Sequence, residues 1–303
     1  MTGQTASVGA PALAEFNYGQ IRRDMLVRRI GRIAFYFNPI FSYFFLWVPI
    51  VVLVLFSFND SKTVSVWGGF STRWYESILL NSESEFTKGM LSGLQNTLFV
   101  GVISALIATT IGTMVAIALE RFNFPGKKLI DGVLYLPIVI PEITQAVSLA
   151  IFFKFLFDLL ERTTGASLSY GFATIIIGHV VFSVSFVVVT VRGRLADMNP
   201  RYEEAARDLG ANEWLTFWRV TFPLILPGVV SGGLLAFTLS LDDYIVTYFN
   251  NGVGTNTLPI FVYGSLRQRV SPEINALSTL MLLASMVLVG FSLWLQNRGA
   301  EQT

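Results

Sequence analysis

Residues 172–191 read FATIIIGHVVFSVSFVVVTV, a run without any Asp, Glu, Lys or Arg. A helix of this length, at about 1.5 Å per residue, matches the hydrocarbon core of a bilayer, which is about 30 Å thick. Comparable apolar stretches occur at residues 38–58, 91–119, 223–241 and 276–295. The pattern predicts an all-α integral membrane protein.

Residues 129–153 form a further apolar segment, but Pro137, Pro141 and Glu142 interrupt it. Proline removes a backbone donor and breaks a helix, and broken helices occur in membranes where they line a cavity. This segment is therefore predicted to be a kinked or discontinuous third span, which brings the total to about six transmembrane helices.

The composition agrees with a lipid environment, because 53% of the residues are hydrophobic and only 14% are charged, against about 25% charged in ordinary soluble domains. The net charge of +1 gives no reason to expect a nucleic-acid partner. The chain has no Cys and one His, His179, so we expect no metal site. His179 lies in an apolar run, which favours a role in helix packing over ligand binding.

The positions of the basic residues predict the orientation, since Lys and Arg are retained on the cytoplasmic side. With the N-terminus inside, fourteen of the 21 fall on that side, in residues 22–32, 121–128 and 192–219 and at Arg298. Both termini are therefore expected to be cytoplasmic.

This topology divides the chain into three parts. Residues 1–37 are expected to be a cytoplasmic tail followed by a basic amphipathic helix in the inner interface. Residues 38–296 form the six-helix membrane domain, with a cytoplasmic loop at 192–222, and residues 297–303 form a short cytoplasmic tail.

The loop at 192–222 has the signals of two helices. Asn199 can cap, Pro200 fits a first helical position and Gly210 is a natural stop, so a short helix is expected between them. Asn212 then caps a second helix that runs to Pro223. A helical hairpin on the cytoplasmic face of a membrane bundle favours docking over catalysis.

The same loop carries a family resemblance. Glu204-Ala205-Ala206, followed by Gly210 and then by Pro223, resembles the cytoplasmic signature loop of importer-type ABC permeases, which inserts a coupling helix into an ATPase subunit. The resemblance implies the type I ABC importer permease fold. It also implies that ATPase coupling involves Glu204, Ala205, Ala206, Gly210 and Glu213.

Three acidic residues lie in apolar segments: Glu142, Asp242 and Asp243. An ionised group at a helix centre costs about 2.5–3.5 kcal/mol on insertion scales and is therefore a functional candidate. Carboxylates without a basic partner suit organic ammonium ions. The two aspartates could instead belong to a hydrated outer end of the fifth span. The aromatic face of Trp74 offers cation–π attraction or ordinary anchoring at the membrane interface.

A narrower resemblance extends from about Arg29 over nearly the whole chain. Ser57-Phe58-Asn59 with Trp74-Tyr75, the run FTLSLDD at 237–243, and SPEINAL at 271–277 resemble the second permease of spermidine/putrescine importers. By this resemblance Trp74, Glu142, Ser240, Asp242 and Asp243 are expected to act in substrate passage.

The resemblance also implies the assembly. Such a permease pairs with a homologous permease, two copies of an ATP-binding subunit and a periplasmic polyamine-binding protein in the bacterial inner membrane. The chain has no Gly-x-x-x-x-Gly-Lys-Ser/Thr loop, so ATP and Mg are expected on the partner ATPase. This chain is expected to bind no cofactor and to transport rather than catalyse.

Alternatives remain open. The substrate of an ABC importer could be another small solute, such as an amino acid or iron, although an anion would be expected to meet basic residues in the spans. An ion-driven secondary transporter would use the same carboxylates without an ATPase. An intramembrane hydrolase would need a nucleophile with its base. With one His and no Cys, the sequence offers few residues for such a site.

Overall fold

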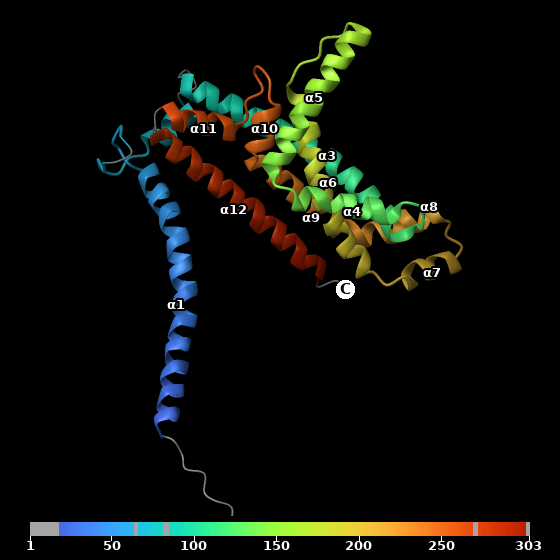
Figure 1. The fold of residues 1–303 in the computed structure, drawn as a ribbon, viewed down its shortest axis with the longest axis horizontal. Helices are drawn as coiled ribbons and strands as arrows, with labels where there is room; N and C mark the ends of the chain where they lie inside the picture. Colours follow the sequence, from blue (N-terminus) through green and yellow to red (C-terminus); the bar gives the residue numbers. More distant parts are fainter. Residues whose placement is uncertain (1–17, 64–65, 81–84, 269–271, 301–303) are drawn as a thin grey trace, which may run out of the picture. The chain divides into compact units, whose positions relative to one another are not determined.

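The computed structural model describes residues 18–63, 66–80, 85–268 and 272–300, and some side chains within the first and last helices lie outside this description. The described residues are helical apart from turns, loops and an isolated bridge between Asn59 and Phe70 (Figure 1). Residues 1–55 and residues 56–303 form two separate units.

The first unit is built on α1 (Tyr18–Ser57), which contains an apolar span at Phe35–Ser57. The first predicted span is confirmed. The helix continues without a break through residue 37, so the basic segment and the span belong to one helix. The division into an interfacial helix and a membrane domain stays a prediction.

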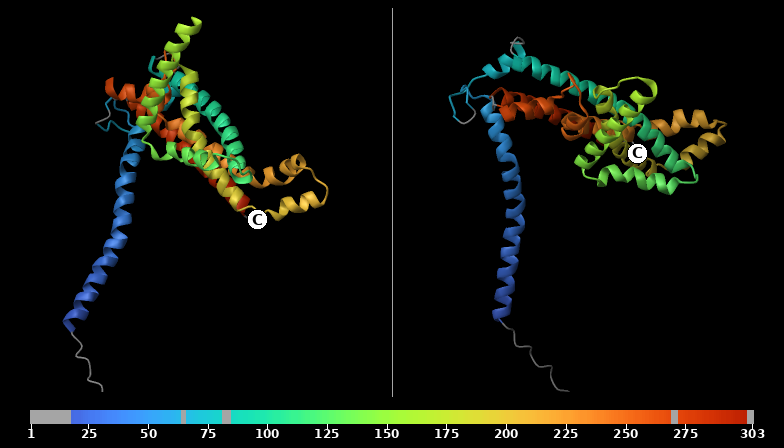
Figure 2. Two further views of the ribbon diagram at one scale, coloured as in Figure 1. Left: turned by 45° about the vertical axis from the view of Figure 1, so that its right-hand side comes forward. Right: turned by 45° about the horizontal axis from the view of Figure 1, so that its top comes forward.

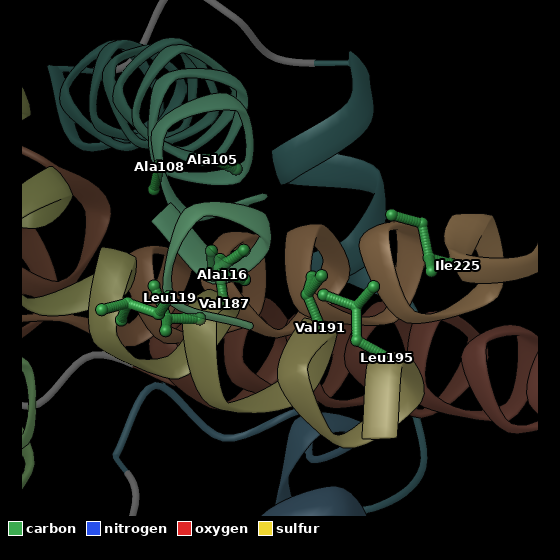
Figure 3. Packing of buried hydrophobic residues seen from close by; sticks show 10 residues of the cluster. Ala105, Ala108, Ala116, Leu119, Val187, Val191, Leu195 and Ile225 are labelled. Atoms are coloured by element: carbon green, nitrogen blue, oxygen red, sulfur yellow. The ribbon is translucent and has the colours of Figure 1, made fainter. Parts of the chain in front are cut away.

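The core of the second unit joins α3 (Glu85–Arg121), α6 (Phe172–Ala196) and α9 (Phe222–Asp242), as Figure 3 shows from close by. Small residues let these helices approach closely, as helices do in lipid. Ala108 and Ala116 of α3 are fully buried there, and Gly112 between them faces Val187 of α6.

The third span is broken as predicted, but its bounds differ from 129–153. It consists of α4 (Lys127–Val139) and α5 (Glu142–Thr164), and α5 alone is long and apolar enough to cross a membrane. The expected end at Phe153 is wrong because Lys154 and Asp158 form an (i, i+4) ion pair within the helix, which weakens their effect as a stop signal.

A second cluster of buried apolar residues joins further helices of this unit. Short helix α2 (Arg73–Leu80) packs with α11 (Leu258–Gln268) and α12 (Pro272–Ala300) around Met90. The sixth expected span, 276–295, falls in α12, and the part with described side chains, Pro272–Val287, is apolar.

The predicted hairpin projects from one end of the second unit in all three views (Figures 1 and 2). Asn199 accepts a backbone hydrogen bond at the start of α7 (Arg201–Asp208), and Gly210 has the positive φ of a helix stop. Asn212 caps α8 (Glu213–Thr216) as expected. The second helix does not end at Pro223, because the π-helix η1 (Phe217–Thr221) joins α8 to α9.

A methyl group at Gly112 would test the close packing of α3 on α6. The added Cβ would lie 2.7 Å from Val187 Cβ, so we expect Gly112→Ala to destabilise the bundle by about 1–3 kcal/mol, as overpacking does. Melting of the purified complex in detergent would measure this.

Gly132→Ala is the matched control, because nothing lies within 4 Å of the Cβ position at Gly132 in α4. Equal melting temperatures for Gly112→Ala and the wild type would contradict the close packing of α3 and α6.

Candidate functional site

Two helix breaks lie beside one cavity of about 620 Å³, within the range of about 300–1,000 Å³ typical of small-molecule sites. One break separates α4 from α5 and the other separates α9 from α10 (Ile245–Asn250). Its lining is mostly apolar, with three carboxylates: Pro137, Ile138, Ile140, Glu142, Gln145, Phe182, Phe186, Leu239, Asp242, Asp243, Tyr244, Ile245 and Val246.

The first break exposes backbone carbonyls that a continuous helix would use. Gln145 donates its side-chain amide to the carbonyl oxygens of Pro137 at 2.7 Å and Ile140 at 2.9 Å. A freed backbone group must find such a partner in a membrane. Specific hydrogen bonds therefore stabilise the break, and it places Glu142 in the first turn of α5, at the cavity.

The second break is organised by Asp243. Its carboxylate accepts hydrogen bonds from the backbone N–H of Val246 at 3.3 Å and of Thr247 at 2.8 Å, and from the Thr247 hydroxyl at 2.9 Å. These are the free donors of the first turn of α10, which an aspartate commonly caps. Asp243 is only 5% exposed, so most of its hydrogen-bonding capacity serves the fold.

His179 of α6 connects both sides of this second break. Its Nε2 lies 3.0 Å from Asp243 Oδ1 and 2.9 Å from Thr247 Oγ1, and its Nδ1 lies 2.5 Å from Ser240 Oγ. A neutral His179 would donate from Nε2 to an ionised Asp243, which can only accept, and would accept from the Ser240 hydroxyl at Nδ1. The contacts match the packing role expected of this histidine.

Ser240, His179 and Asp243 are the residue types of a hydrolytic triad, but their burial argues against that chemistry. Ser240 is 3% exposed and His179 is 1% exposed. A nucleophile must reach a substrate carbonyl, and this hydroxyl lies in the contact between α6 and α9. The arrangement cross-links helices and presents no attacking group.

Adjacent aspartates therefore have different surroundings. Asp242 is exposed and borders the cavity, whereas Asp243 is buried in the His179 network. Glu142 lines the same cavity and is exposed. None of the described residues that line the cavity is Lys or Arg, so the site has the charge that suits a cation.

Trp74 lies elsewhere in the structure. It is not among the described residues that line the cavity, and its indole N–H donates to the backbone oxygen of Asn59 at 2.6 Å. The guanidinium of Arg73 stacks over its ring at 4.2 Å from the centroid. The structure therefore brings together Glu142, Asp242 and Asp243, with Ser240 behind them, but not Trp74.

The residues expected to couple to an ATPase lie on the projecting hairpin. Glu204, Ala205 and Gly210 are exposed, as is Glu213 on α8, and Ala206 is half-buried. Next to them Leu209 is 89% exposed, which adds an apolar tip to the same surface.

Glu203 is the residue that sequence reasoning missed on this hairpin. It is buried and accepts a bidentate ion pair from Arg121 of α3 and a hydrogen bond from the hydroxyl of Thr221 at 2.5 Å. Neighbouring helix positions point about 100° apart, so only one of two adjacent glutamates can face the bundle. That geometry was the available signal for separating Glu203 from Glu204.

Comparisons with known proteins agree with this architecture. Residues 108–298 match the family of the binding-protein-dependent transport system inner membrane component. The spermidine/putrescine permease PotC of Escherichia coli K12 is 39% identical over 82% of this chain and 88% of its own length. The putrescine permease PotI of the same strain is 39% identical over 85% of this chain and 88% of its own length.

A solved structure shares the fold. A chain of the crystal structure of a bacterial ABC transporter that imports the acidic polysaccharide alginate aligns with a TM-score of 0.67 at 16% identity, covering 94% of this chain and 99% of that one. The expected fold class, an all-α membrane protein built like the type I ABC importer permeases, is confirmed. The chain belongs to the family of inner membrane components of binding-protein-dependent transport systems, the permease subunits of bacterial ABC importers.

Proposed function

We propose that this chain forms half of the translocation pathway of an ATP-driven polyamine importer that takes up putrescine or spermidine. The observation that carries the proposal is the cavity with three carboxylates and no Lys or Arg among its described lining. Similarity to polyamine permeases over most of the chain supports the same cargo. An amine entering this cavity would exchange hydration for charge-assisted hydrogen bonds.

The carboxylates take different parts in this proposal. Asp242 and Glu142 meet the ammonium group directly, because they are exposed at the cavity. Asp243, held by His179 and Thr247, keeps the second break in shape and adds negative charge. Ser240 orients His179, and Trp74 would contact substrate only outside the cavity, at the outer mouth.

The proposed complex contains a homologous permease as heterodimer partner, two copies of an ATP-binding subunit and a periplasmic polyamine-binding protein. ATP and Mg are bound by the ATPase, and this chain itself binds neither. Both termini lie in the cytoplasm, so the hairpin of α7 and α8 docks on the ATPase through Glu204, Ala205, Ala206, Gly210 and Glu213. Closure of the ATPase subunits moves this hairpin, and the cavity alternates between the two sides of the membrane.

Two rival functions have distinct outcomes. Uptake of labelled putrescine and spermidine by cells that carry the complete transporter, with and without its ATPase subunit, separates them. Uptake that persists without the ATPase would identify an ion-driven secondary transporter. A wild-type complex that takes up neither amine would overturn the polyamine cargo and favour another small solute, such as an amino acid or iron.

Neutralising the exposed carboxylates tests the cation site. We expect Asp242→Asn and Glu142→Gln each to lower the putrescine uptake rate about tenfold or more, since a hydrogen bond to a charged group contributes about 1.5–3 kcal/mol. Glu161→Gln, the same change on an exposed residue of α5 outside the cavity lining, should leave uptake unchanged. Normal uptake by both cavity variants would overturn the site.

Asp243 is expected to respond differently from Asp242. Asp243→Asn weakens the bond to His179 and the cap of α10, so it should lower the melting temperature of the complex as well as uptake. Leaving a buried partner unsatisfied costs about 1–3 kcal/mol. Asp242→Asn should leave melting unchanged. Identical melting behaviour of the two variants would contradict the separate roles.

The adjacent glutamates of the hairpin give a matched pair. Glu204→Gln should lower co-purification of the ATPase subunit and uptake while the melting temperature of the permease stays constant, because Glu204 is exposed. Glu203→Gln should lower the melting temperature, because Arg121 loses its ion pair. A lower melting temperature for Glu204→Gln, with an unchanged one for Glu203→Gln, would contradict these roles of the two glutamates.

A further inference from the structure

Three tyrosines gather beside the carboxylate cavity. Tyr244 lines the cavity and connects α9 to α10 directly after Asp243. Its ring centroid lies 4.6 Å from that of Tyr263 in α11 and 5.4 Å from that of Tyr248 in α10. We call these three residues the tyrosine cluster. Two helices therefore contribute to one aromatic surface that continues the cavity wall.

Two tyrosines of the cluster are exposed, and Tyr244 is half-buried. Tyr248 is 52% exposed and Tyr263 is 41% exposed, whereas the core positions between α3 and α6 are almost fully buried. The rings are tilted against one another, and the two exposed rings leave part of their faces free for a ligand. An aromatic face carries partial negative charge and attracts cations.

A cation already lies on this surface. The guanidinium of Arg267 is 4.9 Å from the centroid of Tyr263, and its Nη2 donates to the Tyr263 hydroxyl at 3.1 Å. Among the described residues Arg267 forms no ion pair with a carboxylate. The guanidinium rests on the Tyr263 ring while Arg267 stays exposed, so an aromatic face of the cluster is accessible to an organic cation.

We propose that the tyrosine cluster is a second cation subsite, which takes the distal ammonium group of a linear diamine or polyamine while Asp242 and Glu142 hold the first. Tyr244 is the ring that the amine contacts from inside the cavity, and Tyr248 and Tyr263 support it. The proposal rests on the proposed function, because it assigns the other end of the same substrate.

The two subsites differ in how strongly they bind an ammonium group, and this difference favours release of the substrate during transport. Carboxylates bind an ammonium by charge-assisted hydrogen bonds, whereas an aromatic face attracts it at an exposed site by only about 0.5–1 kcal/mol. A weak second contact aligns the chain of the substrate without trapping it. A monoamine would have no group to place on the cluster.

Ring chemistry at position 244 provides the test. We expect Tyr244→Leu to lower the saturated uptake rate of labelled putrescine about twofold to fivefold in the complete transporter, and Tyr244→Phe, which keeps the aromatic face, to stay at the wild-type rate. Substituting mono-, di- and trifluorinated phenylalanine at 244 should lower the rate stepwise, since fluorine withdraws charge from the ring face without changing its packing much.

Controls separate this subsite from folding and from the carboxylate site. Tyr43→Leu, at an exposed tyrosine of α1, should leave uptake unchanged, and the melting temperatures of all variants should agree. Equal rates for Tyr244→Leu, Tyr244→Phe and the fluorinated series, together with failed uptake by Asp242→Asn, would overturn the tyrosine subsite and leave the proposed function standing. Normal uptake by Asp242→Asn as well would overturn both.

Discussion

Backbone groups inside a membrane have no water to bond with, and the structure depends on how this chain meets that requirement at its two helix breaks. At the first break Gln145 donates to the carbonyl of Pro137 in α4 and to that of Ile140 directly after it, and at the second Asp243 accepts from the first donors of α10. Each break thus carries its own polar side chain. The two breaks border one cavity, so the side chains that bond their backbone groups also form part of its polar lining.

Two pairs of adjacent acidic residues each consist of one buried and one exposed member. In Glu203–Glu204 the first residue is buried against Arg121 and the second is exposed; in Asp242–Asp243 the order is reversed. Within α7 a rotation of about 100° separates the two glutamates, whereas Asp243 lies in the break after α9 and bonds to α10. The buried member anchors the local structure, which fixes the direction in which the exposed member points.

Hydrophobic runs and proline positions were enough to predict the helical membrane fold and the broken third span from the sequence. Both follow from the lack of water in the bilayer core. The end of that span was misplaced because Lys154 and Asp158 read as separate charges, whereas one helical turn brings them together. The three carboxylates were found because charges stand out in apolar segments. The partners of His179 and Glu203 were not, because Ser240, Thr247 and Arg121 come from distant segments, and only tertiary packing shows which of them meet.

One helix connects the hairpin to the cavity. Thr221 holds Glu203 of α7 at one end of α9, and Asp242 stands at its other end, about 30 Å away at 1.5 Å per residue. Glu203 also binds Arg121 at the end of α3, so α7 is fastened to two helices of the packed core. A loop attached only by its chain could move without disturbing the bundle, but α7 cannot be displaced unless α3 and α9 follow or the contacts of Glu203 break. Asp242 is the last residue of α9. A movement of α7 that displaces α9 therefore also displaces Asp242 at the cavity.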